Sequence, residues 1–163
     1  MSQTLSVRWP DRYRPEVCPV HVRNELDMAA SPQQVWAALI DAPQWPQWYV
    51  NASNVRLLGD GPGLSLGQAF RWKTFGVTIT STVREFVPGE RIAWDGCAPG
   101  LDVYHGWVLQ PSDRGCRVLT EETQHGILVR LGQLFMPGRM FRFHQIWLQA
   151  LEARACGAGA AQF

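Results

Sequence analysis

Apolar and polar residues alternate along most of the chain. In residues 18–28, CPVHVRNELDM, apolar side chains at Val20, Val22, Leu26 and Met28 face one way, and mostly charged or imidazole side chains face the other. This period of two is typical of a strand that packs one face on a core. The sequence predicts about seven such strands, and the six later ones lie near residues 53–58, 68–75, 76–86, 91–94, 101–110 and 116–124.

A helix is predicted directly after the first strand. Ser31 can cap it, Pro32 suits its first position, and Gln34 can complete a capping box with Ser31. An apolar stripe at helical spacing follows, and Pro43 ends the helix. The next residues, PQWPQWY at 43–49, are too short and too rich in proline for a long helix, and predict a turn or a second short helix.

The chain from residue 126 to 155 is also predicted to be helical. Pro137 and Gly138 should divide it into a short helix and a longer one from about Arg139 to Ala155. Apolar side chains gather on one face of the longer helix, which is therefore expected to be mostly covered. They are Met140, Phe143, Trp147, Ala150 and Leu151, widened by Phe141 and Leu148.

These elements predict an α+β fold. An antiparallel sheet with one face in water has to cover its other face, and the C-terminal helix is the only predicted element long enough to do so. The length of 163 residues fits one domain. We assign residues 1–16 to an N-terminal arm lying on the domain, residues 17–155 to the domain itself, and residues 156–163 to a frayed tail.

Composition narrows the classes of function. A net charge of +1 without a local cluster of Lys and Arg argues against a nucleic-acid partner. No run of roughly 18 apolar residues is present, so no integral membrane segment is predicted. Without an apolar N-terminal signal, a cytoplasmic protein is expected. The four cysteines fit no zinc spacing and are expected to be reduced and buried.

Four segments resemble the START-like, or SRPBCC, superfamily, which includes polyketide cyclases, plant allergen-type carriers and lipid-transfer domains. They are SPQQVWAALIDAPQWPQW (31–48), VREFVPGERIAWDG (83–96), HGWVLQP (105–111) and GCRVLTEETQHGIL (115–128). Their order and spacing are specific for the fold and not for an activity. The resemblance implies a helix-grip fold, in which a curved antiparallel sheet wraps around the C-terminal helix and two short helices follow the first strand.

The resemblance further implies a cavity between the sheet and the C-terminal helix that holds apolar or aromatic ligands. The break at Pro137 and Gly138 should border its mouth. Eight tryptophans fit this picture, because converging rings can either fill such a space or wall it. The candidate ligand-binding residues are Trp45, Trp48, Phe70, Trp72, Ile79, Trp94, Trp107, Met140, Phe143, His144 and Trp147.

His105 and Glu122 are the candidate catalytic residues. A histidine on an inward strand face can act as a general acid or base, or can simply satisfy a hydrogen bond in a mixed core. Without an identified partner, the sequence favours the structural role. Glu122 can supply that partner if Thr120 and Glu122 face inward, whereas the opposite strand register buries Leu119 and Glu121 instead.

Two further groups of side chains have alternative interpretations. His144 can point into the cavity, although a histidine on the flank of a helix usually touches water. Arg130, Arg139 and Arg142 can line the mouth and attract a carboxylate, although arginines beside an apolar helix usually extend to solvent.

Three functions are compatible with these features. The first is binding or transport of a hydrophobic, lipid-like or aromatic small molecule. The second is a cyclase or dehydratase of the polyketide type, in which His105 and Glu122 move protons. The third is a protein-interaction domain. No glycine-rich phosphate loop, nucleophile elbow or metal-binding motif is present, so no cofactor and no metal are predicted. A monomer or homodimer is expected.

Overall fold

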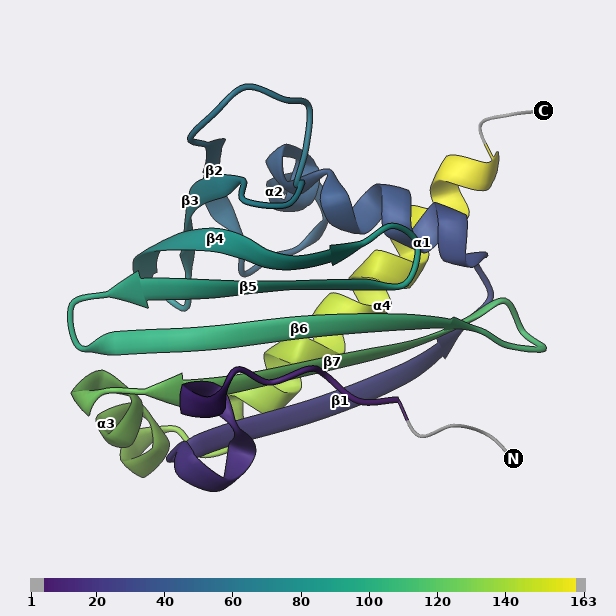
Figure 1. Cartoon of the computed structure of the whole chain (residues 1–163). Helices are drawn as coiled ribbons and strands as arrows, with labels where there is room; N and C mark the ends of the chain where they lie inside the picture. The colour runs from purple at the N-terminus through teal and green to yellow at the C-terminus, as the bar shows by residue number, and fades with distance from the viewer. Residues whose placement is uncertain (1–4, 161–163) are drawn as a thin grey trace.

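A computed structural model describes residues 5–160, which contain one seven-stranded antiparallel sheet with helices across one face (Figure 1). The strand order is β1-β7-β6-β5-β4-β3-β2, so β1 and β7 are the one pair of neighbouring strands in this sheet that are distant in sequence. The strands are β1 (Val20–Met28), β2 (Ser53–Leu57), β3 (Ala69–Thr74), β4 (Val77–Val87), β5 (Arg91–Ala98), β6 (Leu101–Pro111) and β7 (Cys116–His125). The predicted seven strands are confirmed.

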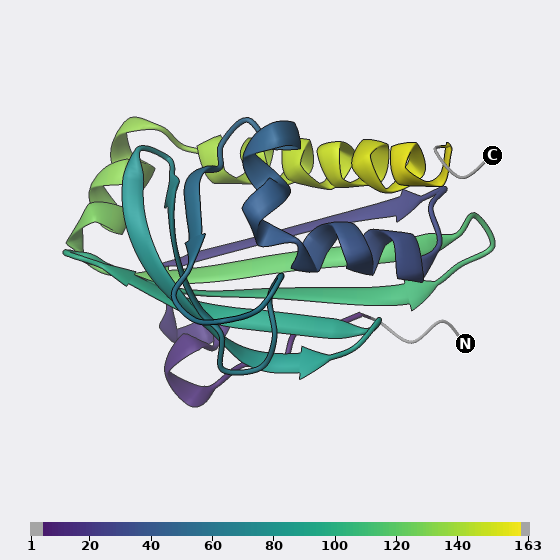
Figure 2. The same cartoon turned by 90° about the horizontal axis from the view of Figure 1, so that it is seen from above.

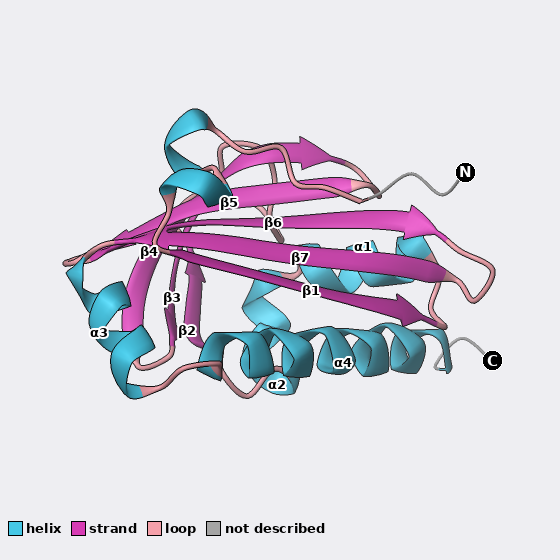
Figure 3. Ribbon diagram, turned by 90° about the horizontal axis from the view of Figure 1, so that it is seen from below, coloured by secondary structure: helices cyan, strands magenta, loops and turns pink. Residues whose placement is uncertain are grey.

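The helices lie mainly on the inner face of this sheet, where α4 packs on β1 and α1 (Figures 2 and 3). The α-helices are α1 (Pro32–Ile40), α2 (Trp45–Trp48), α3 (Ile127–Phe135) and α4 (Arg139–Ala160), and the 3-10 helices are η1 (Asp11–Tyr13), η2 (Pro15–Val17) and η3 (Ala42–Gln44). A register shift between Val83 and Glu85 in β4 accompanies the curvature of the sheet. The predicted helix-grip α+β fold is therefore confirmed.

The local signals for α1 act as expected. The backbone N–H of Gln34 donates to Ser31 Oγ at 3.3 Å, and the N–H of Ser31 donates to Gln34 Oε1 at 2.9 Å, which completes the capping box. α3 and α4 are separated at Met136, Pro137 and Gly138, as the sequence predicts. These contacts set the ends of the helices before any long-range packing is considered.

The buried face of α4 differs from the predicted one. Five side chains are buried at helical spacing, namely His144, Trp147, Leu148, Leu151 and Ala155. Phe141, which the sequence placed beside the core, is 51% exposed. α4 continues to Ala160, beyond the end predicted near Ala155, and residues 161–163 lie outside the described part.

An aromatic core holds the helices on the sheet. The ring of Trp45, from α2, is fully buried and packs against Phe70, Trp72, Trp94 and Trp147 at centroid distances between 5.2 and 5.9 Å. Its indole N–H donates to the carbonyl of Leu39 at 3.0 Å, so the buried donor is satisfied. The helix pair is therefore fixed by one ring that contacts both the sheet and α4.

The N-terminal arm covers part of the outer face of the sheet (Figure 1). Leu5, Val7 and Tyr13 are buried in a second apolar cluster on this face. Gly106 of β6 permits this close approach, because a Cβ atom there would lie 2.6 Å from Val7 Cγ1. The outer side chains of β6 and β7 are consequently shielded from water. Residues 1–4 of the predicted arm lie outside the described part.

The cysteines only partly match expectation. All four are free thiols, but only Cys116 is buried, whereas Cys97 and Cys156 are exposed and Cys18 is half-buried. The expectation of four buried cysteines is therefore wrong. Cys97 occupies an outward-facing position of β5, and Cys156 lies on the solvent side of α4.

We expect Trp45→Ala to lower the free energy of unfolding by about 3–5 kcal/mol, because it empties the centre of the aromatic core. Trp45→Phe keeps most of the ring contacts and loses the bond to Leu39, so its cost should be smaller, about 1–2 kcal/mol. Urea unfolding of the three proteins measures both values. Equal stability of Trp45→Ala and the wild type would contradict a core organised around Trp45.

Candidate functional site

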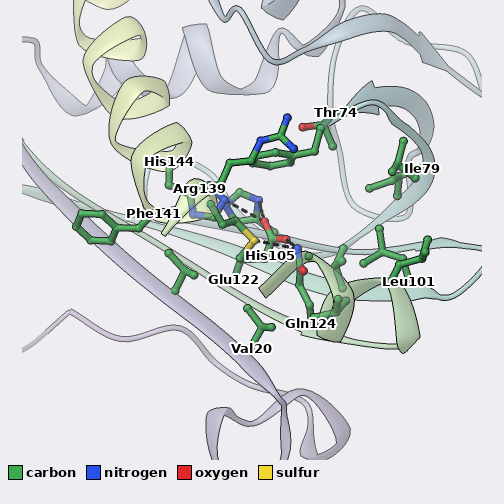
Figure 4. A pocket seen from close by; sticks show the side chains of 18 of the residues that line it. Val20, Thr74, Ile79, Leu101, His105, Glu122, Gln124, Arg139, Phe141 and His144 are labelled. Atoms are coloured by element: carbon green, nitrogen blue, oxygen red, sulfur yellow. Dashed lines mark hydrogen bonds and ion pairs between the residues drawn. The ribbon is translucent and has the colours of Figure 1, made fainter. Parts of the chain in front are cut away.

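A cavity of about 580 Å³ lies between the inner face of the sheet, α3 and the first turns of α4 (Figure 4). Most of its lining side chains are apolar, and they come from β1, β3 to β7, α3 and α4. The break at Pro137 and Gly138 lies on its wall. Part of the space that a helix-grip fold encloses is therefore hollow.

Six of the eleven predicted ligand-binding residues line this cavity: Trp72, Ile79, Trp94, Met140, His144 and Trp147. The other five, Trp45, Trp48, Phe70, Trp107 and Phe143, are not among its lining residues. Of these, Trp45, Phe70 and Trp107 belong to the aromatic core, at the side of the cavity where rings pack directly on one another. The tryptophans thus fill one part of the interior and wall the adjoining part.

Several lining residues were not singled out from the sequence. Val20 and Val22 of β1 face the cavity, and their alternation with polar residues was the available signal. Leu128 and Val129 of α3 close another side. Tyr49 lines the cavity next to α2, where its ring stacks on Trp147 with centroids 4.4 Å apart. No single-residue pattern marks Tyr49, because its position depends on how α2 folds back.

Three buried polar side chains meet on the cavity wall: His105 of β6, Glu122 of β7 and His144 of α4. Glu122 Oε2 lies 3.1 Å from His105 Nδ1 and accepts a hydrogen bond from His144 Nε2 at 3.2 Å. The two imidazole rings stack with centroids 4.9 Å apart and planes 13° apart. One carboxylate oxygen therefore bridges two histidines.

Neighbouring side chains hold this cluster in place. His105 Nε2 lies 2.6 Å from Thr120 Oγ1, which fixes the ring from its other side. Gln124 donates from Nε2 to Glu122 Oε1 and also lies 3.0 Å from Met140 Sδ. Both carboxylate oxygens of Glu122 thus have hydrogen-bond donors, which a buried charge requires.

Burial and neighbours set the charges of the cluster. Loss of hydration lowers the pKa of His105 from 6.5 to about 3, although the charge of Glu122 opposes this shift. Burial alone would raise the pKa of Glu122, but the adjacent His105, the hydrogen bond from His144 and the amide of Gln124 together lower it to about 2. At neutral pH the cluster therefore holds an ionised Glu122 beside a neutral His105.

The register of β7 that the sequence left open is resolved. Glu122 pairs with His105 and Val22 and faces inward. Glu121 faces the outer side and is also buried, because the N-terminal arm covers it and Val7 donates its N–H to the carboxylate. Both alternatives bury a glutamate, so burial alone could not have distinguished them.

The same three side chains form a group that could hold a metal ion. His105, Glu122 and His144 each offer one ligand atom, and these atoms lie within 4.8 Å of one another. Imidazole and carboxylate are ordinary ligands of zinc and iron. No sequence motif indicates this arrangement, because the three residues come from three different elements.

Because burial lowers the pKa of His105, this imidazole takes up a proton below about pH 6.5 in the unfolded chain but stays neutral in the folded protein. We therefore expect stability to fall as the pH drops from about 6.5 to about 5, with His105 contributing up to about 1.4 kcal/mol per pH unit. Urea unfolding across this range should give a shallower dependence for His105→Asn, whose amide does not titrate. Identical slopes for both proteins would show that His105 is not held neutral.

Comparisons with known proteins agree on the fold. The crystal structure of protein jhp0584 from Helicobacter pylori is similar at 31% sequence identity and a TM-score of 0.87, covering 95% of this chain and 99% of that one. TTHA0849 from Thermus thermophilus matches at 18% identity and a TM-score of 0.70, covering 85% and 99%. The di-domain ARO/CYC StfQ from the steffimycin biosynthetic pathway matches at 18% identity and a TM-score of 0.68, covering 86% and 52%. A comparison with curated proteins found no significant match.

A family model gives the assignment directly. The model described as polyketide cyclase / dehydrase and lipid transport matches residues 19–155, which include the whole sheet, the cavity and most of α4. Within the described residues, no helix has both the length and the apolar character needed to cross a membrane. The chain therefore belongs to the polyketide cyclase / dehydrase and lipid transport family.

Proposed function

We propose that the protein binds a hydrophobic, lipid-like or aromatic small molecule in the cavity beside α4. The observation that carries this proposal is the cavity itself, because about 580 Å³ falls within the range of small-molecule sites. If this part of the interior served only for packing, side chains would be expected to fill it, because empty apolar space is costly. The family description, which includes lipid transport, supports the same conclusion.

The lining favours a ligand with a flat or flexible apolar body. Trp72, Trp94 and Trp147 provide ring surfaces, and Ile79 and Leu101 provide aliphatic ones. Polar side chains are fewer than apolar ones, and one group of them surrounds the carboxylate of Glu122. Such a site holds the body of a ligand by burial and its orientation by a small number of hydrogen bonds.

The first experiment is native mass spectrometry of the purified protein beside its denatured mass, followed by titration with the neutral fluorescent probe N-phenyl-1-naphthylamine. We expect a bound species or saturable probe binding. Leu101→Trp should weaken probe binding by about tenfold or more, because it fills the cavity.

Leu58→Trp is the matched control, since Leu58 is 55% exposed and does not line the cavity. It should bind the probe as the wild type does. A wild-type protein that carries no ligand and does not bind the probe would refute the proposal.

A second candidate is acid–base chemistry on the bound molecule, favoured by the buried cluster of His105, Glu122 and His144. If Glu122 is ionised and both imidazoles donate to it, the lone pair of His105 lies on Nε2 toward Thr120 and that of His144 lies on Nδ1. Nδ1 of His144 is buried and has no hydrogen-bond partner among the described residues. A polar hydrogen of a substrate would satisfy it.

Comparing the ligands that co-purify with the wild type and with Glu122→Gln tests this second function. A dehydratase step, or a cyclisation that ends in dehydration, removes one water, so the variant should retain a species heavier by one water than the species in the wild type. The same ligand mass in both proteins, with probe binding intact, would favour a carrier without chemistry. Glu121→Gln, on the outer face, is the matched control.

A further inference from the structure

We infer that the molecule bound in the cavity carries an acidic group, such as a carboxylate, and that Arg139 binds it. This inference rests on the proposed function and specifies the chemical class of its ligand. Two lining side chains can carry a full charge at neutral pH apart from the histidines: Glu122 and Arg139. Glu122 has its hydrogen-bond donors within the protein, whereas Arg139 has no carboxylate partner among the described residues.

The guanidinium of Arg139 is available for a ligand. Within residues 5–160, no carboxylate oxygen lies within 4.0 Å of it, and its polar contact runs from Nη1 to the thioether of Met136 at 3.6 Å. A thioether sulfur is only a weak acceptor. Arg139 is also half-buried, so part of its hydration has been lost without an ionic partner in return.

Two aromatic rings hold the guanidinium at the cavity. Its central carbon lies 5.3 Å from the ring centre of Phe75 and 5.8 Å from that of Phe143, and these two rings pack edge to face at 5.3 Å. Contact with ring faces fixes a planar group and leaves its N–H edge free to donate. A carboxylate matches that edge with two parallel hydrogen bonds.

The remaining charges orient an acid in one direction. The ionised Glu122 repels a second carboxylate from the part of the cavity near β6 and β7. The first turn of α4, which includes Met140, also lines the cavity, and the positive end of this helix adds to the attraction of Arg139. Figure 4 shows Arg139 and Thr74 above the carboxylate of Glu122 in that view. The acidic head should therefore lie at Arg139 with the apolar body toward the tryptophans.

Pairs of ligands that differ only in charge test the inference. Displacement of N-phenyl-1-naphthylamine is measured near pH 7.5 with 2-naphthoate against 2-naphthamide, and with dodecanoate against dodecanol. We expect each acid to bind the wild type about 10- to 100-fold more tightly than its neutral counterpart. Arg139→Gln should abolish this preference, so that each acid and its neutral counterpart bind within about twofold of each other. Arg139→Lys should restore part of the preference, because it keeps the charge and loses the two-bond geometry.

Arg142→Gln is the matched control, because Arg142 lies on the same helix, is exposed and does not line the cavity. It should keep the full preference for acids. The inference is overturned if acids and neutral compounds bind the wild type equally, if neither acid displaces the probe, or if Arg139→Gln keeps the preference. Failure of the wild type to bind the uncharged probe is a different result, which refutes the proposed function itself.

Discussion

Trp147 joins α4 to both the sheet and the helix pair. Its ring packs edge-on against Trp45 at 5.2 Å and Trp107 at 5.0 Å, and stacks on Tyr49 at 4.4 Å. One turn earlier on the same helix, His144 reaches Glu122. Because a packed aromatic contact tolerates little displacement, the position of Trp147 also determines where the imidazole of His144 lies. The cavity begins where this packing ends, between the first turns of α4 and the curved end of the sheet.

Glu122 is a buried carboxylate beside an apolar cavity, and its surroundings explain why it is tolerated. Burying a carboxylate without partners would favour its protonation, yet two imidazoles and the amide of Gln124 supply donors to both of its oxygens. Replacing the cluster with apolar side chains would have given a simpler core. A fixed negative charge on the wall of an apolar cavity instead restricts how a ligand can lie, and this restriction is useful to a binding site whether or not it catalyses a reaction.

Local signals in the sequence were enough for most of the fold. The capping box at Ser31, the break at Pro137 and the alternation along the strands act over a few residues, and the structure follows them. Phe141 is more exposed than predicted and α4 is longer than predicted, because both depend on how the helix packs against the sheet and α1. The candidate functional site was harder to predict from the sequence than the fold. His105, Glu122 and His144 are brought together by the pairing of β6 with β7 and by the rotation of α4, neither of which leaves a short-range pattern.

The N-terminal arm shows why the register of β7 could not be read from burial. In a sheet with one face in water, buried and exposed side chains alternate along each strand. An exposed Glu121 would then have marked the outer face of β7. The arm removes that difference by covering the outer face, where His21 and Arg23 also lie against Glu121 at 3.2 and 3.1 Å. The two glutamates differ in their partners. Glu121 is neutralised by an arginine beneath a closed surface, whereas Glu122 is held by two imidazoles beside an open volume. Only the second arrangement can exchange a proton or a hydrogen bond with a bound molecule, so the cavity side of β7 is where function is to be sought.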